Sequence, residues 1–405
     1  MKKKIAVIVL SLILMLSFVQ TAFAAGQTHQ LDFDENGEFT ILHVCDIQDG
    51  YPVSKSCAQY LRETLNVYKP DLVVLGGDNT VAAQEDKELA IKEICEIFVE
   101  AQTYFTLVFG NHDAENNMSR EEQFVLYKLY GGEYCLAYDA DESLTGVGTH
   151  NLTVLSSDRT RIAYNIYMFD SNMYVYDEKG EELGYDCVNP DQIDWYKGVS
   201  ASLREQNGGE PVPAMAFQHI APQEANEVLF VESPIPLGLL GQDKDGITYT
   251  YLPEFWKIKE GLMLEHPGSG YYNYGQFDAM AEAGDVDAVF FGHDHVNDYV
   301  IEKDGIEMIN TPSCTFNSYA DTSSWGTRLI TINENDVHNY KTEIILVGAM
   351  ALREGSEILS YGEITADEAR ASVFARWLGQ LFIKVTRYIA YEVAPKVMEL
   401  IGGLV

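Results

Sequence analysis

The chain has 405 residues, 46% of them hydrophobic, and a formal net charge of −35. This length suits one large α/β domain with an appendage, or two domains. The electrostatic field of so negative a protein repels the phosphates of nucleic acids. This excludes a protein that binds nucleic acid polymers nonspecifically. A small anionic substrate would need local positive charge, which bound metal cations would supply.

The first 24 residues have the pattern of a Sec-type signal peptide. Three lysines open the chain, the stretch Ile5–Val19 is almost wholly apolar, and Ala22-Phe23-Ala24 is a small-x-small cleavage site. We expect cleavage before Ala25 and a mature protein that is secreted or extracytoplasmic, in the cell envelope. An uncleaved membrane anchor is the alternative, which the short apolar stretch disfavours.

Three strand-like runs alternate with two helical stretches in the first third of the chain. The runs are Phe39–Val44, Asp71–Gly77 and Tyr104–Gly110, and the helical stretches lie at about 56–68 and 85–100. This βαβαβ pattern predicts parallel strands buried on both faces, with ligands bound beyond their carboxyl ends. Those ends carry Asp46, Gln48, Asp78, Asn111 and His112.

The second half repeats this arrangement. Val212–Phe217 leads into His219, and Val286–Gly292 leads into His293 and His295. Residues two apart on an extended segment point the same way, so both imidazoles could face one object while Asp294 points elsewhere. Because neutral imidazole is a common ligand of divalent transition metals, we predict that all five strand ends form one polar, metal-binding site.

Five motifs occur in the order D-x-Q, GGDN, GNHD, QH and GHDH between Phe39 and Leu346. This set resembles the five-block signature of the calcineurin-like metallophosphoesterases. Within that superfamily, the stretch SGYYNYGQFDAMAEAGDVDAVFFGHDHVNDY is most similar to the small purple-acid-phosphatase-like branch of plants, fungi and bacteria. The resemblance implies a four-layer α/β/β/α sandwich of two mixed sheets, with a dinuclear metal site at the strand ends.

By position, the resemblance implies that Asp78 bridges two divalent metal ions. Asp46, Gln48 and His295 would complete the first metal site, and Asn111, His219 and His293 the second. Asp78 and His112 would be the catalytic residues, and Asn111 and His112 would contact the substrate. His112 would donate a proton to the leaving oxygen or place positive charge on the phosphate, and Asp113 would either orient its imidazole or make an ordinary loop hydrogen bond.

The reaction that this resemblance implies is hydrolysis of a small phosphate ester by a metal-activated hydroxide. The resemblance to the purple-acid-phosphatase-like branch favours a phosphomonoester as the substrate. Hydrolysis of a phosphodiester or nucleotide at the same site is one alternative. Binding of metal and a phosphorylated ligand without turnover is another.

Two residues depart from the pattern of the family. Gln48 stands where most members have histidine, and it would either bind the first metal through its amide oxygen or hold a metal-bound water. A harder, oxygen-rich site favours Mn²⁺ or Fe²⁺, with Zn²⁺ as the alternative. Val81 stands where true purple acid phosphatases carry the tyrosine that binds Fe³⁺, so we expect no tyrosinate–iron centre.

A long segment between His219 and His293 is rich in aromatic residues, namely Tyr249, Tyr251, Phe255, Trp256, Tyr271, Tyr272 and Tyr274. We expect these residues to pack within the segment, with a wall of the substrate pocket as the alternative. His266 has no motif around it and is interpreted as a surface or structural histidine.

We divide the chain into a signal peptide at 1–24, a metallophosphoesterase domain at 25–348 and a C-terminal helical extension at 349–405. In the extension, Pro395 should kink or end the helix. Charged residues there exclude an ordinary membrane span. Docking on the enzyme body or self-association is the first interpretation of this amphipathic helix, and peripheral membrane contact is the alternative. Its apolar stripe comprises Phe374, Trp377, Leu378, Leu381, Phe382 and Val385.

Overall fold

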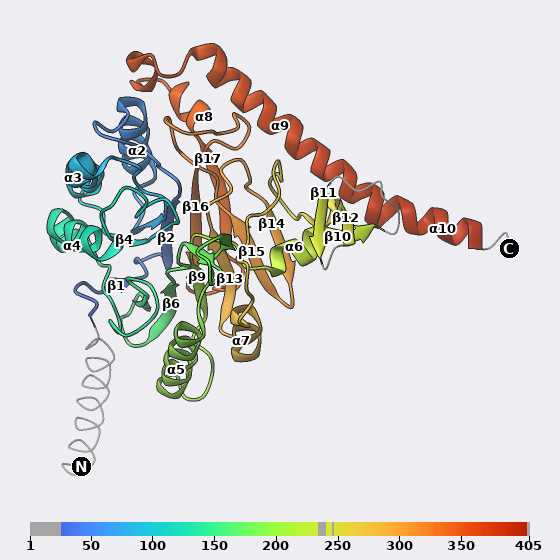
Figure 1. Cartoon of the computed structure of the whole chain (residues 1–405), viewed down its shortest axis with the longest axis horizontal. Helices are drawn as coiled ribbons and strands as arrows, with labels where there is room; N and C mark the ends of the chain where they lie inside the picture. The colour runs from blue at the N-terminus through green and yellow to red at the C-terminus, as the bar shows by residue number, and fades with distance from the viewer. Residues whose placement is uncertain (1–25, 234–239, 245–246, 403–405) are drawn as a thin grey trace, which may run out of the picture.

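A computed structural model describes residues 26–233, 240–244 and 247–402 (Figure 1). The predicted leader at 1–24 lies outside the described residues. The described chain forms two mixed β-sheets with helices on their outer faces and a long C-terminal helix. The predicted fold class, a four-layer sandwich with a C-terminal helix, is therefore confirmed.

The first sheet has five strands in the order β17-β16-β2-β3-β4. Strands β2, β3 and β4 are parallel, as the βαβαβ pattern predicted, and β16 runs antiparallel to both β2 and β17. Three helices, α2, α3 and α4, follow these parallel strands along the chain. The bounds are β2 (Glu38–Val44), α2 (Lys55–Tyr68), β3 (Leu72–Gly76), α3 (Gln84–Glu100), β4 (Phe105–Val108), α4 (Arg120–Gly131), β16 (Gly326–Asn333) and β17 (Lys341–Leu346).

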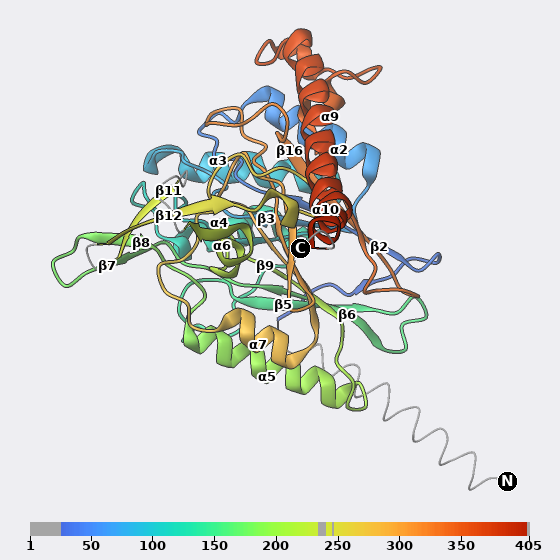
Figure 2. The same cartoon turned by 90° about the vertical axis from the view of Figure 1, so that its right-hand side faces the viewer.

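The second sheet has seven strands in the order β1-β5-β6-β9-β13-β15-β14, of which β6, β9, β13 and β15 are parallel. Helices α5 and α7 lie together beside it (Figure 2). The bounds are β1 (Leu31–Asp32), β5 (His150–Leu155), β6 (Ile162–Met168), α5 (Pro190–Gln206), β9 (Ala214–Phe217), α7 (Gln276–Ala283), β13 (Val286–Phe291), β14 (Val300–Lys303) and β15 (Ile306–Asn310).

Smaller elements complete the described fold. A hairpin of β7 and β8 precedes α5, and a three-stranded sheet in the order β10-β12-β11 follows α6. The bounds are β7 (Tyr174–Tyr176), β8 (Glu182–Tyr185), α6 (Glu224–Leu229), β10 (Phe230–Ser233), β11 (Leu240–Lys244) and β12 (Ile247–Pro253).

Strands β3, β4 and β9 are buried along their whole length, and β2 is buried on both faces after its first residues. In β2, Phe39 and Ile41 point into the layer between the two sheets, whereas Leu42 and Val44 point toward the helices. Successive side chains of a strand alternate between faces, so a strand buried on both sides must be apolar throughout. This two-sided burial fixes the register of the sheets and therefore the position of each strand end.

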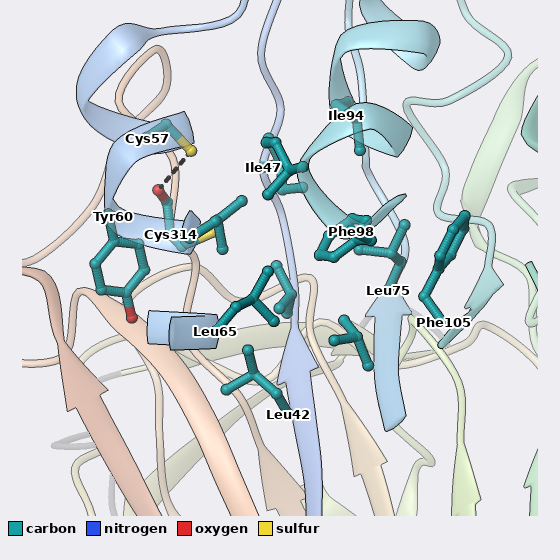
Figure 3. Packing of buried hydrophobic residues seen from close by; sticks show 14 of the residues in the cluster. Leu42, Ile47, Cys57, Tyr60, Leu65, Leu75, Ile94, Phe98, Phe105 and Cys314 are labelled. Atoms are coloured by element: carbon teal, nitrogen blue, oxygen red, sulfur yellow. Dashed lines mark hydrogen bonds between the residues drawn. The ribbon is translucent and has the colours of Figure 1, made fainter. Parts of the chain in front are cut away.

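The core between α2, α3 and the first sheet contains Tyr60, Leu65, Phe98 and Phe105 (Figure 3). The buried hydroxyl of Tyr60 donates a hydrogen bond to the Ile345 carbonyl at 2.6 Å and lies 2.8 Å from Thr327 Oγ1. These contacts join α2 to β16 and β17. All six cysteines are free, so this core is held by packing and hydrogen bonds.

The C-terminal part begins with α8 (Val347–Ala351) and continues with α9 (Ala366–Tyr388), a π-helical turn at Ile389–Val393 and α10 (Ala394–Gly402). Pro395 therefore lies just after the π-helical turn, in which the Ala394 N–H donates to the Ile389 carbonyl, five residues back along the chain. Pro395 was predicted to kink or end the helix. The structure instead places a π-helical turn directly before the short helix that contains it. No described helix is long and apolar enough to cross a membrane.

Substitution of Tyr60 by Phe tests the tie between α2 and the strands. Removing the buried hydroxyl leaves the Ile345 carbonyl without this donor, and we expect the free energy of unfolding to fall by about 1–2 kcal/mol. The shift in the urea midpoint measures this loss. Tyr176→Phe, at a position 56% exposed, is the matched control and should leave the midpoint unchanged. Equal midpoints for the two variants would contradict the proposed tie.

Candidate metal centre

The carboxyl ends of five strands from the two sheets converge on one edge of the sandwich. The first sheet supplies Asp46 and Gln48 after β2, Asp78 after β3, and Asn111 and His112 after β4. The second sheet supplies His219 after β9, and His293 and His295 after β13. The parallel strands direct these ends to the same edge, as predicted.

Asp78, His219 and His293 form the centre of the cluster. One potential ligand atom from each of these buried residues lies within 4.8 Å of the others. The Nε2 atom of His219 is 3.1 Å from Asp78 Oδ2 and 3.9 Å from Asp46 Oδ1. The Nδ1 atom of His219 lies 2.9 Å from the Gly76 carbonyl, which can accept its proton and so leave Nε2 directed at the carboxylates.

His295 also lies close to Asp46. Its Nε2 atom is 3.6 Å from Asp46 Oδ1, and its Nδ1 lies 2.7 Å from the Tyr319 carbonyl. The Tyr319 ring also stacks on this imidazole, with centroids 4.2 Å apart. A backbone carbonyl partner is the usual way in which a metal-binding histidine is held in one orientation.

Gln48 lies beside the central carboxylate, where its side-chain amide donates a hydrogen bond to Asp78 Oδ2 at 3.2 Å. This contact uses the donor end of the amide. The structure thus brings Gln48 to the cluster, and its role as a ligand stays a prediction.

The backbone at the strand ends adopts a conformation that side chains rarely accept. Asp46, Gln48, Asp78 and His293 all have positive φ angles, of 51°, 41°, 49° and 69°. Such left-handed residues are costly for non-glycine side chains and cluster at functional sites. Gly110 permits the tight approach of two strand ends, because a Cβ there would lie 2.2 Å from Asp78 Oδ1.

Burial sets the protonation of the cluster. It lowers the pKa of His293 to about 3 and that of His295 to about 4, so both imidazoles are neutral, as metal ligands must be. Burial alone would also lower the pKa of His219, but the Asp78 and Asp46 carboxylates raise it to about 10. Burial raises the pKa of Asp46 well above its ordinary range, although His219 partly offsets this effect. The buried carboxylates therefore favour a positive charge beside them.

The potential ligand atoms of the cluster suit divalent cations. Asp46 Oδ1, Asn111 Oδ1 and His219 Nε2 are buried, and none of the described residues gives them a well-formed hydrogen bond. A buried polar atom without a partner needs an explanation, and a bound cation is one that suits oxygen and imidazole nitrogen atoms gathered at one place. Carboxylate and amide oxygens together with imidazole nitrogens match the ligand preferences of Mn²⁺, Fe²⁺ and Zn²⁺.

A chain of hydrogen bonds joins Asn111 to His112. The Asn111 side-chain amide donates to the Tyr174 hydroxyl at 2.8 Å, and this hydroxyl donates to Glu115 Oε1 at 2.7 Å. The other oxygen of Glu115 lies 2.7 Å from His112 Nδ1. Glu115, and not Asp113, therefore orients the imidazole of His112.

Asp113 makes loop contacts instead. Its carboxylate accepts hydrogen bonds from the backbone N–H groups of Gly110, Asn79 and Thr80. Of the two roles left open by the sequence, the structure shows the ordinary loop hydrogen bonds.

A cavity of about 390 Å³ opens beside the cluster. Tyr251, Phe255, Trp256, Tyr271, Tyr272 and Tyr274, which we considered as a pocket wall, do not line it, and the side chain of Tyr249 lies outside the described residues. His266, interpreted from the sequence as a surface or structural histidine, is exposed and lines this cavity. Sequence reasoning missed Tyr185 and Tyr319, because no motif surrounds them. The lining comprises Gln48, His112, Tyr185, Glu265, His266, Gly268, His293, Asp294, His295, Ser318 and Tyr319.

Two converging sheets with a cluster of carboxylates, imidazoles and amides at their strand ends define an α/β protein with a candidate dinuclear metal centre. The calcineurin-like phosphoesterase family model matches residues 39–297. The chain belongs to the calcineurin-like phosphoesterase family.

The relatives include purple-acid-phosphatase-like proteins, which confirms the predicted branch. The chain is 26% identical to "Probable inactive purple acid phosphatase 14" of Arabidopsis thaliana, over 76% of this chain and 78% of that protein. It is 26% identical to "Phosphatase DCR2" of Saccharomyces cerevisiae, over 80% of this chain and 57% of that protein. A dimetal phosphatase from Danio rerio is similar in structure, with a TM-score of 0.44 and 12% identity, over 76% of this chain and 98% of that chain.

Substitution of Gly110 by Ala tests whether the close approach of the strand ends holds the metal ligands in place. The added Cβ must displace the Asp78 carboxylate, so we expect the tightly held divalent metal to fall from about two ions per chain to one or none. Elemental analysis after dialysis measures the metal content. Gly198→Ala in α5 is the control, because a Cβ there meets nothing within 4 Å. Full metal retention by the Gly110 variant would contradict the geometry.

Proposed function

We propose that this chain is a metal-dependent phosphoesterase that hydrolyses a small phosphate ester. The observation that carries the proposal is the buried cluster of potential ligand atoms from Asp78, His219 and His293, beside a cavity lined by His112. Asp78 would contact both of two divalent ions. Asp46, Gln48 and His295 would hold one of these ions, and Asn111, His219 and His293 the other.

When bound, two divalent cations supply positive charge for the phosphoryl oxygens and lower the pKa of a water molecule. The residues of the chain hold the metal-binding side chains in fixed orientations. Carbonyl partners fix the imidazoles of His219 and His295, and the N–H of His112 donates to Asp78 Oδ1 at 2.8 Å. These fixed groups would hold the two ions in one arrangement, so that a phosphate bound to them is already positioned, which removes much of the entropic cost of the reaction.

His112 would donate the proton that the leaving oxygen needs. Its Nδ1 atom is held by Glu115, so Nε2 is the ring nitrogen left for a substrate. The side chain is 38% exposed and lines the cavity, which places it within reach of a bound ester. Proton donation by a positioned side chain typically contributes 10²–10⁴-fold to the rate.

A phosphomonoester is the favoured substrate, because the relatives carry phosphatase names. The cavity volume suits a small molecule, and its Tyr185 and Tyr319 rings offer apolar surface to an organic leaving group. A phosphodiester or nucleotide is the alternative substrate at the same site. The apolar leader pattern at 1–24 supports export of the enzyme to the extracytoplasmic side.

Binding of metal and a phosphorylated ligand without turnover is the second candidate function. Two observations favour it. The relatives from Arabidopsis thaliana are named as probable inactive enzymes, and Gln48 donates to Asp78 where most family members have histidine. An intact His112 beside an intact Asp78 favours catalysis.

A hydrolysis assay distinguishes these functions. The protein is stripped of metal, reloaded with Mn²⁺, Fe²⁺, Zn²⁺ or Mg²⁺, and given an aryl phosphomonoester or an aryl phosphodiester. We expect metal-dependent turnover of the monoester, highest with Mn²⁺ or Fe²⁺, that falls about 100-fold in His112→Ala. His338→Ala, at an exposed position, is the matched control. Two bound ions without turnover on any ester would contradict the enzyme and favour the binding protein.

Glu115→Gln tests the orientation of His112. If Glu115 positions His112 as the proton donor, loss of the Glu115 carboxylate should slow hydrolysis most for substrates with a poor leaving group. We expect kcat to fall about 10-fold on an alkyl phosphate and much less on 4-nitrophenyl phosphate, with metal content unchanged. Glu133→Gln, an exposed glutamate, is the control. Equal losses on both substrates would mean that Glu115 has only a structural role.

A further inference from the structure

The C-terminal helix exposes a long apolar face. Between residues 373 and 398 of the described chain, many large apolar side chains are more than a third exposed, and five of them are aromatic. Soluble proteins rarely expose so continuous an apolar surface without a partner. The outer apolar face of the helix comprises Phe374, Trp377, Leu378, Leu381, Val385 and Tyr388, which are 43–62% exposed.

The opposite face of α9 is fixed to the body. The buried side chains of Ser372 and Ile383 lie on this inner face, and Ser372 Oγ donates to the Thr322 carbonyl at 2.5 Å. Arg376 makes an ion pair with the buried carboxylate of Asp298. The Arg387 guanidinium donates to the Ile258 carbonyl at 2.7 Å. The expected docking on the enzyme body therefore uses one face of the helix only.

Helical spacing separates these two faces. Phe374, Leu378, Leu381, Val385 and Tyr388 follow each other at intervals of three and four residues, which places them on one side of the helix. Ser372, Arg376 and Ile383 each lie two residues before a residue of the outer face, namely Phe374, Leu378 and Val385, which turns them to the other side of the helix. Because the inner face is anchored, α9 cannot rotate to bury its outer face on the same body.

The helix also extends past the body. Figure 1 shows α10 continuing beyond the strands β10, β11 and β12, away from the two large sheets. The side chains of Val397 and Met398 in α10 are 49% and 68% exposed. Apolar side chains are therefore exposed on α10 as well as on α9, and a flat partner could contact both helices.

The composition of this surface favours lipid. Trp377, Tyr388 and Tyr391 are exposed, and tryptophan and tyrosine prefer the boundary between lipid headgroups and acyl chains. Residues 373–402 carry four basic and two acidic side chains, in a chain whose net charge is −35. Two of the basic residues, Arg376 and Arg387, are engaged on the inner face, so the rest of this segment carries two basic and two acidic side chains and no net charge. A second copy would bring a body of equal negative charge against this face, whereas a zwitterionic lipid surface carries no such repulsion.

We propose that α9 and α10 form a membrane-surface anchor. The outer apolar face of the helix lies in the plane of a bilayer, between headgroups and acyl chains, and the inner face holds the phosphoesterase body on the membrane. An amphipathic helix that binds in this way does not cross the membrane.

Vesicle flotation tests the anchor. The chain from residue 25 onward contains every described element, and it is mixed with phosphatidylcholine vesicles with and without phosphatidylglycerol. We expect it to float with the phosphatidylcholine vesicles, and more weakly when phosphatidylglycerol is present, because the net charge of the chain is −35. The triple variant Trp377→Gln, Leu381→Gln and Tyr388→Gln should bind at least ~10-fold more weakly, because three large apolar side chains no longer enter the lipid.

The matched control changes three exposed apolar residues elsewhere, Leu89→Gln, Val125→Gln and Leu129→Gln on α3 and α4. It should float like the parent protein. Light scattering without lipid measures the oligomeric state of all three proteins. A monomer that fails to float, or equal flotation of the two triple variants, overturns the proposal. A dimer that only the outer-face variant disrupts also overturns it and identifies a second copy as the partner.

Discussion

Two carboxylates, those of Asp46 and Asp78, are buried within 4 Å of the same imidazole nitrogen, at distances of 3.9 and 3.1 Å from His219 Nε2. Buried negative charges are tolerated only beside compensating positive charge or strong hydrogen bonds. Much of the surrounding structure serves this requirement. Left-handed backbone conformations aim the carboxylates inward, Gly110 leaves room for Asp78, and carbonyl partners direct His219 and His295 toward them. A pair of divalent cations satisfies the requirement most completely.

The parts of the site that the sequence predicted are those that depend on local order. A strand buried on both faces ends where its apolar run ends, so Asp46, Asp78, His219 and His293 could be placed at one edge without knowledge of the fold. Tyr174 and Tyr185, on the hairpin of β7 and β8, and Tyr319 could not be predicted, because no motif surrounds them. Glu115 lies three residues after His112, yet the sequence does not show which acidic residue of that loop would face the imidazole.

The sequence also predicted only part of the role of the C-terminal helix. Its apolar stripe was visible from helical spacing, but spacing alone suggested one face and one partner. The structure instead shows an anchored inner face, held through Arg376, Ser372 and Arg387, and an outer apolar face that points away from the body. Docking on the body and contact with a membrane, which the sequence presented as alternatives, are compatible on one helix.

Anomalous X-ray scattering from crystals grown with Mn²⁺ tests the central assignment most directly, because it locates the ions without reference to turnover. We expect two peaks that flank the Asp78 carboxylate, one beside Asp46 and His295 and the other beside Asn111, His219 and His293. The absence of a peak at Asp78, or a single peak with the His219 and His293 side chains turned away from it, would contradict a dinuclear centre at the ends of these strands.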